Sequence, residues 1–157
     1  MHERDIEQQP NNEFINAGRI LYLTKDLELI QKQLIGEQLT NIKPDELLDN
    51  ISTDIIIPNK PALLYMGQDG YLSHFALTGI SQINPGDIEK GHFQTLVAGK
   101  SFARGSSRIH APLALKEAGI NLIIADAERI FFENCINTGL YVLKLETKQA
   151  QKLLNGD

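Results

Sequence analysis

The side chains best suited to chemistry lie in one segment, Gly99-Lys-Ser-Phe-Ala-Arg-Gly-Ser-Ser-Arg-Ile-His-Ala-Pro112. Around a central glycine it places the hydroxyls of Ser106 and Ser107 and the guanidinium groups of Arg104 and Arg108. A strand-like run precedes the segment and a helix-like run follows it, and the first turn of a helix favours negative charge. Guanidinium groups bind carboxylates or phosphates through paired hydrogen bonds. The sequence therefore predicts an anion site at the start of a helix.

The two serines also have a purely structural interpretation. Serine is a preferred N-cap, so Ser106 or Ser107 could do no more than cap the helix that follows. The segment has no second glycine after the serine, as a nucleophile elbow has, and it lacks the Gly-Lys-Ser/Thr ending of a phosphate-binding loop. From the residues alone, capping, ligand binding and proton transfer all stay open.

Four stretches, in order, resemble one family. Gly105-Ser-Ser-Arg-Ile-His-Ala-Pro112 resembles the Gly-Ser-Ser-Arg-Glu-His-Ala signature of the aconitase superfamily swivel domain, which is the separate small subunit in isopropylmalate dehydratases. The other three stretches are Asp49-Asn-Ile-Ser-Thr-Asp-Ile-Ile-Ile-Pro58, Leu122-Ile-Ile-Ala125 and Ala127-Glu-Arg-Ile-Phe-Phe-Glu-Asn-Cys-Ile-Asn-Thr-Gly-Leu140. Together they extend over residues 49–143, which is most of the chain.

The resemblance implies an α/β fold, the layered swivelling β/β/α domain of the aconitase and isopropylmalate dehydratase small-subunit type. The residue pattern agrees with the α/β class, because continuous apolar runs at 95–98, 120–125 and 140–145 alternate with helix-like runs. We expect residues 1–17 to form a flexible N-terminal arm and residues 18–157 to form a single swivel domain.

The resemblance also implies an activity. Such chains are the small subunits of iron–sulfur hydro-lyases that dehydrate or isomerise a hydroxy-dicarboxylate such as isopropylmalate, a step of leucine biosynthesis. By motif, Ser106 would be the base that removes the C–H proton, and Asp54 would orient a catalytic histidine of the partner chain. Asp54 has a second interpretation as a capping residue at a turn. The expected substrate-binding residues are Thr53, Lys60, Arg104, Ser107 and Arg108.

Composition limits what else the chain does. Its only cysteine, Cys135, cannot hold an iron–sulfur cluster, so we expect no cofactor or metal on this chain and a 4Fe–4S cluster on a large subunit. A net charge of −5 argues against nucleic acid or an anionic membrane as partner. Because the first residues are polar and no apolar run approaches the ~20 residues of a membrane span, we expect the chain in the cytoplasm.

Two departures from the family pattern keep alternatives open. Ile109 stands where the family has glutamate, and Arg104 stands where it has a small residue or cysteine. The chain could therefore be a divergent homologue acting on another hydroxy acid, or a carboxylate-binding module without turnover. The apolar side chains at 59–76 favour a substrate with an apolar substituent, whereas Arg104 favours a further carboxylate.

Several local expectations concern the elements around these residues. Asp26 should cap a helix with apolar positions Leu27, Ile30 and Leu34. Asp126 should cap a later helix, which should end at Gly139. We expect residues 55–57 to be a buried strand that ends at Pro58, and residues 59–70 to be loop.

Overall fold

The computed structural model describes residues 18–105 and 109–154. The arm expected at residues 1–17 therefore lies outside the described residues. The elements are, in order, β1 (Ile20–Tyr22), α2 (Leu27–Leu34), the short 3-10 helix η2 (Pro44–Glu46), α3 (Thr53–Ile56), α4 (Asn59–Leu64), α5 (Tyr71–His74), α6 (Asp87–Gly91), β2 (Thr95–Val97), α7 (His110–Glu117), β3 (Leu122–Ile124), α8 (Arg129–Thr138), β4 (Tyr141–Leu143) and α9 (Lys148–Leu154).

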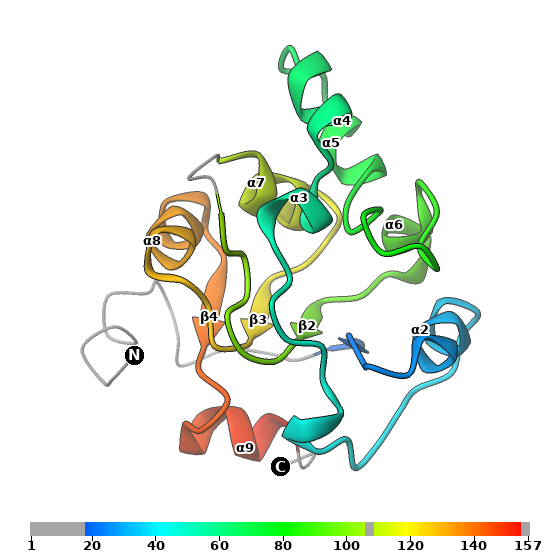
Figure 1. Ribbon diagram of the computed structural model, residues 1–157, viewed down its shortest axis with the longest axis vertical. Helices are drawn as coiled ribbons and strands as arrows, with labels where there is room; N and C mark the ends of the chain where they lie inside the picture. Colours follow the sequence, from blue (N-terminus) through cyan, green and yellow to red (C-terminus); the bar gives the residue numbers. More distant parts are fainter. Residues whose placement is uncertain (1–17, 106–108, 155–157) are drawn as a thin grey trace.

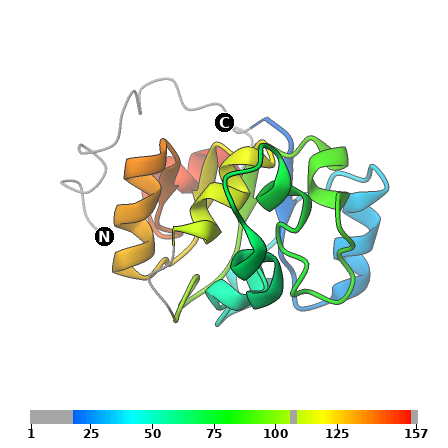
Figure 2. The ribbon, with the colours of Figure 1, turned by 90° about the horizontal axis from the view of Figure 1, so that it is seen from above.

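The centre of the fold is a parallel sheet with strand order β1-β2-β3-β4. Helices lie on both of its faces, with α2, α7 and α8 on one and α9 on the other (Figures 1 and 2). Strands buried on both faces are typically apolar, as these are apart from Thr95 at the start of β2 and the tyrosines of β1 and β4. The α/β class expected from the sequence is confirmed.

Neighbouring residues of each strand face two separate cores. One row across the sheet packs under α2, α7 and α8, and the adjacent row packs toward α9. The first row is Leu21, Leu96, Ile123 and Val142, and the second is Tyr22, Val97, Ile124 and Leu143. All these side chains are buried, so the sheet is a rigid base from which the loops at the strand ends project.

The helix-end predictions succeed where a side chain or a glycine fixes the geometry. Asp26 caps α2 by accepting a hydrogen bond from the Glu28 N–H at 3.1 Å. Gly139 ends α8 with a φ of 85°, in the left-handed region that glycine adopts without a steric penalty. The prediction for Asp126 is wrong, because α8 begins later and its N-cap is Glu128. The Asp126 carboxylate instead lies 3.7 Å from the Lys144 ammonium group.

Two predictions for residues 55–70 are also wrong. The expected strand at 55–57 is largely helix α3, and the expected loop contains α4. Ser52 caps α3 through its hydroxyl, which accepts from the Ile55 N–H at 3.3 Å. A short apolar run fits a buried helix turn as well as a buried strand, and here the cap decides between them. Pro61 falls in the first turn of α4, where a missing N–H costs no helical bond.

The longest described helix, α8, has ten residues. None of the helices in the described ranges has the length and apolar character that crossing a bilayer requires.

Candidate active site

The segment predicted to carry the chemistry lies between β2 and α7, as expected. β2 ends at Val97, residues 99–105 follow at the carboxyl end of the strand, and α7 begins at His110. In parallel α/β sheets, ligands bind at this edge. Ser106, Ser107 and Arg108 fall outside the described residues, but the residues before them, up to 105, and after them, from 109, are described. We call residues 99–105 the entry loop.

Residues 48–53 run alongside the entry loop and hold it by backbone hydrogen bonds (Figure 1). The four bonds run from Gly99 N to Leu48 O (2.9 Å), from Asn50 N to Lys100 O (2.8 Å), from Ala103 N to Ile51 O (2.6 Å) and from Thr53 N to Arg104 O (2.8 Å). An isolated parallel bridge between Ser52 and Arg104 belongs to the same pairing. Two stretches that are about fifty residues apart in the sequence are thereby fixed to one another.

The start of the α8 connection holds the other side of the entry loop. The three backbone bonds there run from Phe102 N to Asp126 O (3.0 Å), from Asp126 N to Gly99 O (3.1 Å) and from Glu128 N to Phe102 O (3.0 Å). Phe102 itself is buried and its ring packs edge-on against Phe131 at 5.5 Å between centroids. The entry loop is therefore anchored on two sides and from within the core.

Left-handed backbone conformations are concentrated in this region. Ser101 and Ala103 have φ values of 53° and 66°, and Asn50 on the paired segment has 59°. Non-glycine residues adopt this region rarely, and such residues cluster at functional sites where surrounding contacts hold them. The hydrogen bonds on both sides of the loop supply such contacts.

Thr53 and Asp54 lie beside the exit of the entry loop. Thr53 is 3% exposed, and a Cβ added to Gly105 would lie 3.3 Å from its hydroxyl oxygen. Asp54 follows in the first turn of α3 and is exposed. Thr53 and Asp54 therefore lie next to the described end of the entry loop, although they precede it by about fifty positions.

Two of the predicted basic residues, Arg104 and Lys60, lie in different parts of the structure. Arg104 is exposed on the entry loop, and its guanidinium group donates to the Asn50 side-chain oxygen at 3.3 Å. Lys60 is exposed in the first turn of α4, and no hydrogen bond or ion pair joins it to the described part of the entry loop. Arg104 thus lies on the entry loop. Lys60 lies on residues 59–74, which contain α4 and α5, project from the body of the fold (Figure 1) and are called the projecting segment below.

Sequence reasoning missed a chain of ring contacts that leads from this projecting segment to the start of α7. Tyr65 packs edge-on against His110 with centroids 5.6 Å apart, and it stacks on Tyr71 at 6.3 Å. Tyr71 in turn contacts Phe75 at 5.3 Å. Spacing of aromatic residues in the sequence indicated an apolar loop, but only the fold brings Tyr65 to His110.

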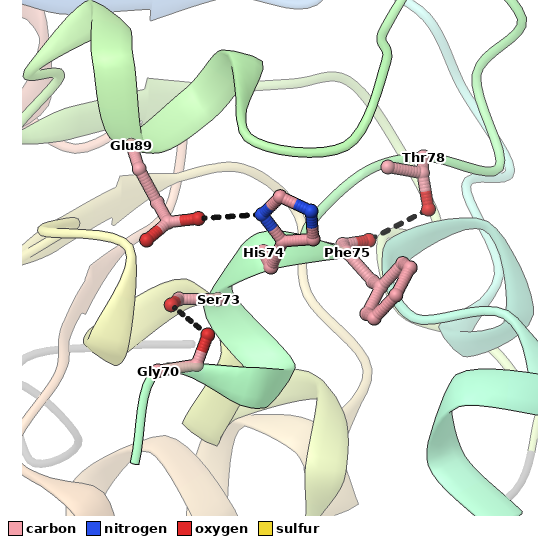
Figure 3. A network of polar contacts seen from close by, with 6 residues as sticks. All are labelled: Gly70, Ser73, His74, Phe75, Thr78 and Glu89. Carbon is pink, nitrogen blue, oxygen red and sulfur yellow. Dashed lines mark hydrogen bonds and ion pairs between the residues drawn. The ribbon is translucent and has the colours of Figure 1, made fainter. Parts of the chain in front are cut away.

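A small polar network holds the base of the projecting segment (Figure 3). The His74 imidazole lies 3.5 Å from the Glu89 carboxylate, which joins α5 to α6. The Ser73 hydroxyl donates to Gly70 O at 3.0 Å, and the Thr78 hydroxyl donates to Phe75 O at 2.7 Å. The Ser73 and Thr78 bonds are local and define turns, whereas the contact of His74 with Glu89 joins two helices.

The cysteine and the acidic and imidazole side chains do not form a metal site within residues 18–105 and 109–154, where no three of them come together. Cys135 lies on the buried face of α8 and is completely buried, and burial raises the pKa of its thiol well above the usual value. A lone, protonated and inaccessible thiol does not fit an iron–sulfur cluster.

Comparisons with known proteins identify the class. The family model for the aconitase C-terminal domain matches residues 86–149, which include the entry loop and the serine motif. The resemblance seen in the sequence is confirmed, because residues 86–149 are similar to the aconitase C-terminal domain.

Within that class, the similar curated proteins are small subunits. The chain is 43% identical over 110 residues to the 3-isopropylmalate dehydratase small subunit 1 of Archaeoglobus fulgidus, a match that covers 69% of this chain and 65% of that protein. It is 39% identical over 115 residues to the isopropylmalate/citramalate isomerase small subunit of Methanocaldococcus jannaschii, covering 69% and 62%.

A crystal structure of a 3-isopropylmalate dehydratase from Methanocaldococcus jannaschii matches with a TM-score of 0.49 and 34% identity, over 60% of this chain and 55% of that one. The chain spans less than two thirds of the length of the curated relatives that it matches.

Proposed function

We propose that this chain is the small subunit of an iron–sulfur hydro-lyase that dehydrates or isomerises a hydroxy-dicarboxylate of the isopropylmalate type. One observation carries the proposal. The two segments that resemble the family, Thr53-Asp54 and the loop leading into Ser106, lie side by side although they are far apart in the sequence. The names of the relatives, at about 40% identity, support the same activity.

In this proposal the serine motif removes a proton. Ser106 takes the proton from the carbon next to the departing hydroxyl, and the N–H groups of the α7 start and the Arg108 guanidinium stabilise its alkoxide. Closure against the partner excludes water, which strengthens these interactions. Ser107 and Arg108 bind the substrate carboxylates, Arg108 through paired hydrogen bonds.

Two groups beside the entry loop complete the site. Thr53 and Asp54 orient a histidine supplied by the partner, because a carboxylate that accepts from one ring nitrogen fixes the tautomer of the other. Arg104 adds positive charge at the mouth of the site, where its bond to Asn50 holds it. Lys60, on the projecting segment, is the outermost substrate contact.

The partner supplies what this chain lacks. A 4Fe–4S cluster held by a large subunit would supply Lewis-acid chemistry toward the departing hydroxyl, and the single cysteine of this chain could not hold such a cluster. We place the pair in the cytoplasm, with a small hydroxy-carboxylate as its ligand and with neither nucleic acid nor membrane as partner, in keeping with a net charge of −5.

Substrate choice lies in the projecting segment. The ring contacts from Tyr71 through Tyr65 to His110 present an apolar surface that reaches the start of α7. Desolvating such a surface beside a further carboxylate costs free energy, so we expect an alkyl substituent there rather than a charged one.

Reconstitution with a large subunit tests the proposal. The pair should turn over isopropylmalate, and in competition it should prefer isopropylmalate and citramalate to citrate and homocitrate. Preference for the tricarboxylates would mean that Arg104 rather than the aromatic surface decides specificity. Binding of isopropylmalate without turnover would instead favour a carboxylate-binding module.

A further inference from the structure

One side chain joins the two segments that carry the proposed site. The Asp49 carboxylate accepts a hydrogen bond from the Lys100 N–H at 2.7 Å, which is a short, charge-assisted contact. The four backbone bonds described above lie on both sides of this point, one at Leu48 and three along residues 50–53. Asp49 thus stands at the position where the entry loop first meets its paired segment.

The entry loop is shaped to receive this carboxylate. A Cβ added to Gly99 would lie 2.1 Å from Asp49 Oδ1 and 2.9 Å from Leu48 O, so only glycine fits there without a shift. Immediately after this contact the chain enters the left-handed region at Ser101 and Ala103. Strained backbone persists only where surrounding contacts determine it, and Asp49 provides a contact directly before the strained residues.

We propose that Asp49 is a positioning residue: its carboxylate fixes the path of the entry loop, residues 99–105, which leads into the serine motif. The inference rests on the proposed function for its catalytic consequence. A change in the path of the loop should reach the serine motif, because the loop leads directly from Lys100 to it. The inference also extends the resemblance, in which only the aspartate at 54 has an assigned role.

The experiment compares three variants of the full chain reconstituted with its large subunit. Asp49→Ala removes the acceptor, Asp49→Asn keeps an oxygen in the same place, and Asp26→Ala is the matched control. Asp26 also accepts from a backbone N–H, at 3.1 Å, but it does so at the start of α2, away from the entry loop. Thermal unfolding of each chain shows whether the two alanine variants are destabilised to a similar extent.

We expect Asp49→Ala to lower kcat about 10- to 100-fold, the range that a misplaced catalytic group costs. Asp49→Asn should stay within about threefold of the wild type, because the amide oxygen still accepts, although more weakly than a carboxylate. Asp26→Ala should keep the wild-type kcat. In the isolated chain, amide hydrogen exchange at Lys100 should become faster in Asp49→Ala and remain slow in Asp26→Ala.

The outcomes separate the inference from the function on which it rests. Absence of turnover by the wild-type pair overturns the proposed function. In a pair that turns over, equal kcat values for Asp49→Ala and Asp26→Ala overturn the positioning role alone. A loss of kcat in Asp49→Asn as large as in Asp49→Ala also contradicts the positioning role, because the loop would then not depend on a hydrogen-bond acceptor at residue 49.

Discussion

The entry loop and the projecting segment lie on either side of α7 and are built in opposite ways. The entry loop has hydrogen bonds along both sides and backbone held in the left-handed region. The projecting segment, residues 59–74, contains two short helices, α4 and α5, joined by residues 65–70. Two of its apolar side chains are largely exposed, Leu63 at 80% and Met66 at 87%. Groups that transfer protons need fixed positions, whereas a surface that accepts different substrates tolerates change.

The comparison gives an order of sensitivity. Substitutions that remove a contact or a reacting group at the entry loop should lower kcat, and substitutions on the projecting segment should change which substrate is preferred. A chain in which both regions responded alike would contradict this division.

The largest expected effect is at Ser106. Ser106→Ala should lower kcat about 10²- to 10⁴-fold, the usual contribution of general acid–base catalysis, and leave KM nearly unchanged. Steady-state kinetics of the reconstituted pair measure this, with the exposed Ser81→Ala as control. Near-normal turnover in Ser106→Ala would show that the serine is only a helix cap.

Gly79 should be the next most sensitive position, although it lies outside the motifs. A Cβ there would lie 2.4 Å from Ile55 Cα, so alanine must displace α3 and with it Thr53 and Asp54. We expect Gly79→Ala to lower the free energy of unfolding by about 1–3 kcal/mol and to reduce kcat.

Gly67→Ala is the control for that substitution. Its added Cβ meets nothing within 4 Å, although its φ of 85° still disfavours alanine. Gly67→Ala should therefore lose up to about 1 kcal/mol of stability and keep kcat. Equal kinetic losses in the two variants would show that the position of α3 is unimportant.

Tyr65 tests the projecting segment. Tyr65→Ala removes the ring that contacts His110 and Tyr71, so the apolar surface loses its link to α7. We expect KM for isopropylmalate to rise about 10-fold, which corresponds to about 1.4 kcal/mol, with a smaller change in kcat. The exposed Met66→Ala serves as control, and a loss of kcat without a change in KM would contradict the assignment.

The smallest expected effect concerns Cys135 and pH. Burial raises the pKa of its thiol above the usual 9.0, so unfolding exposes a group that ionises more easily. The stabilisation is therefore complete below pH 9 and is lost as the pH rises through that value toward the folded-state pKa. The difference in unfolding free energy between wild type and Cys135→Ala should shrink above pH 9, and an unchanged difference would show that the thiol is solvated.

The sequence predicted the elements that local chemistry determines. Asp26 and Gly139 mark helix ends, and strands without polar residues indicate a sheet covered on both faces. It failed at residues 55–57, where three β-branched residues suggested a strand and the Ser52 cap produced a helix. Local propensity is outweighed there by the cap and by two backbone hydrogen bonds, which the N–H groups of Leu77 and Gly79 donate to α3 carbonyls.

The candidate site could be predicted only as far as sequence motifs identify its residues. The motifs indicated which residues to consider, and the resemblance implied that Thr53 and Arg104 belong to one site. The hydrogen bond from Lys100 to Asp49 and the ring contact of Tyr65 with His110 depend on tertiary packing, for which no periodicity in the sequence gives a signal.

The central claim is that this chain works only as the small subunit of a two-chain, cluster-dependent dehydratase. The most direct measurement is isopropylmalate dehydration by the purified chain, by a cluster-loaded large subunit, and by the two combined. The account predicts that each chain alone is inactive, that this chain is colourless, and that the combination turns over with iron–sulfur absorption carried by the large subunit. Turnover by this chain alone in the absence of iron would contradict it.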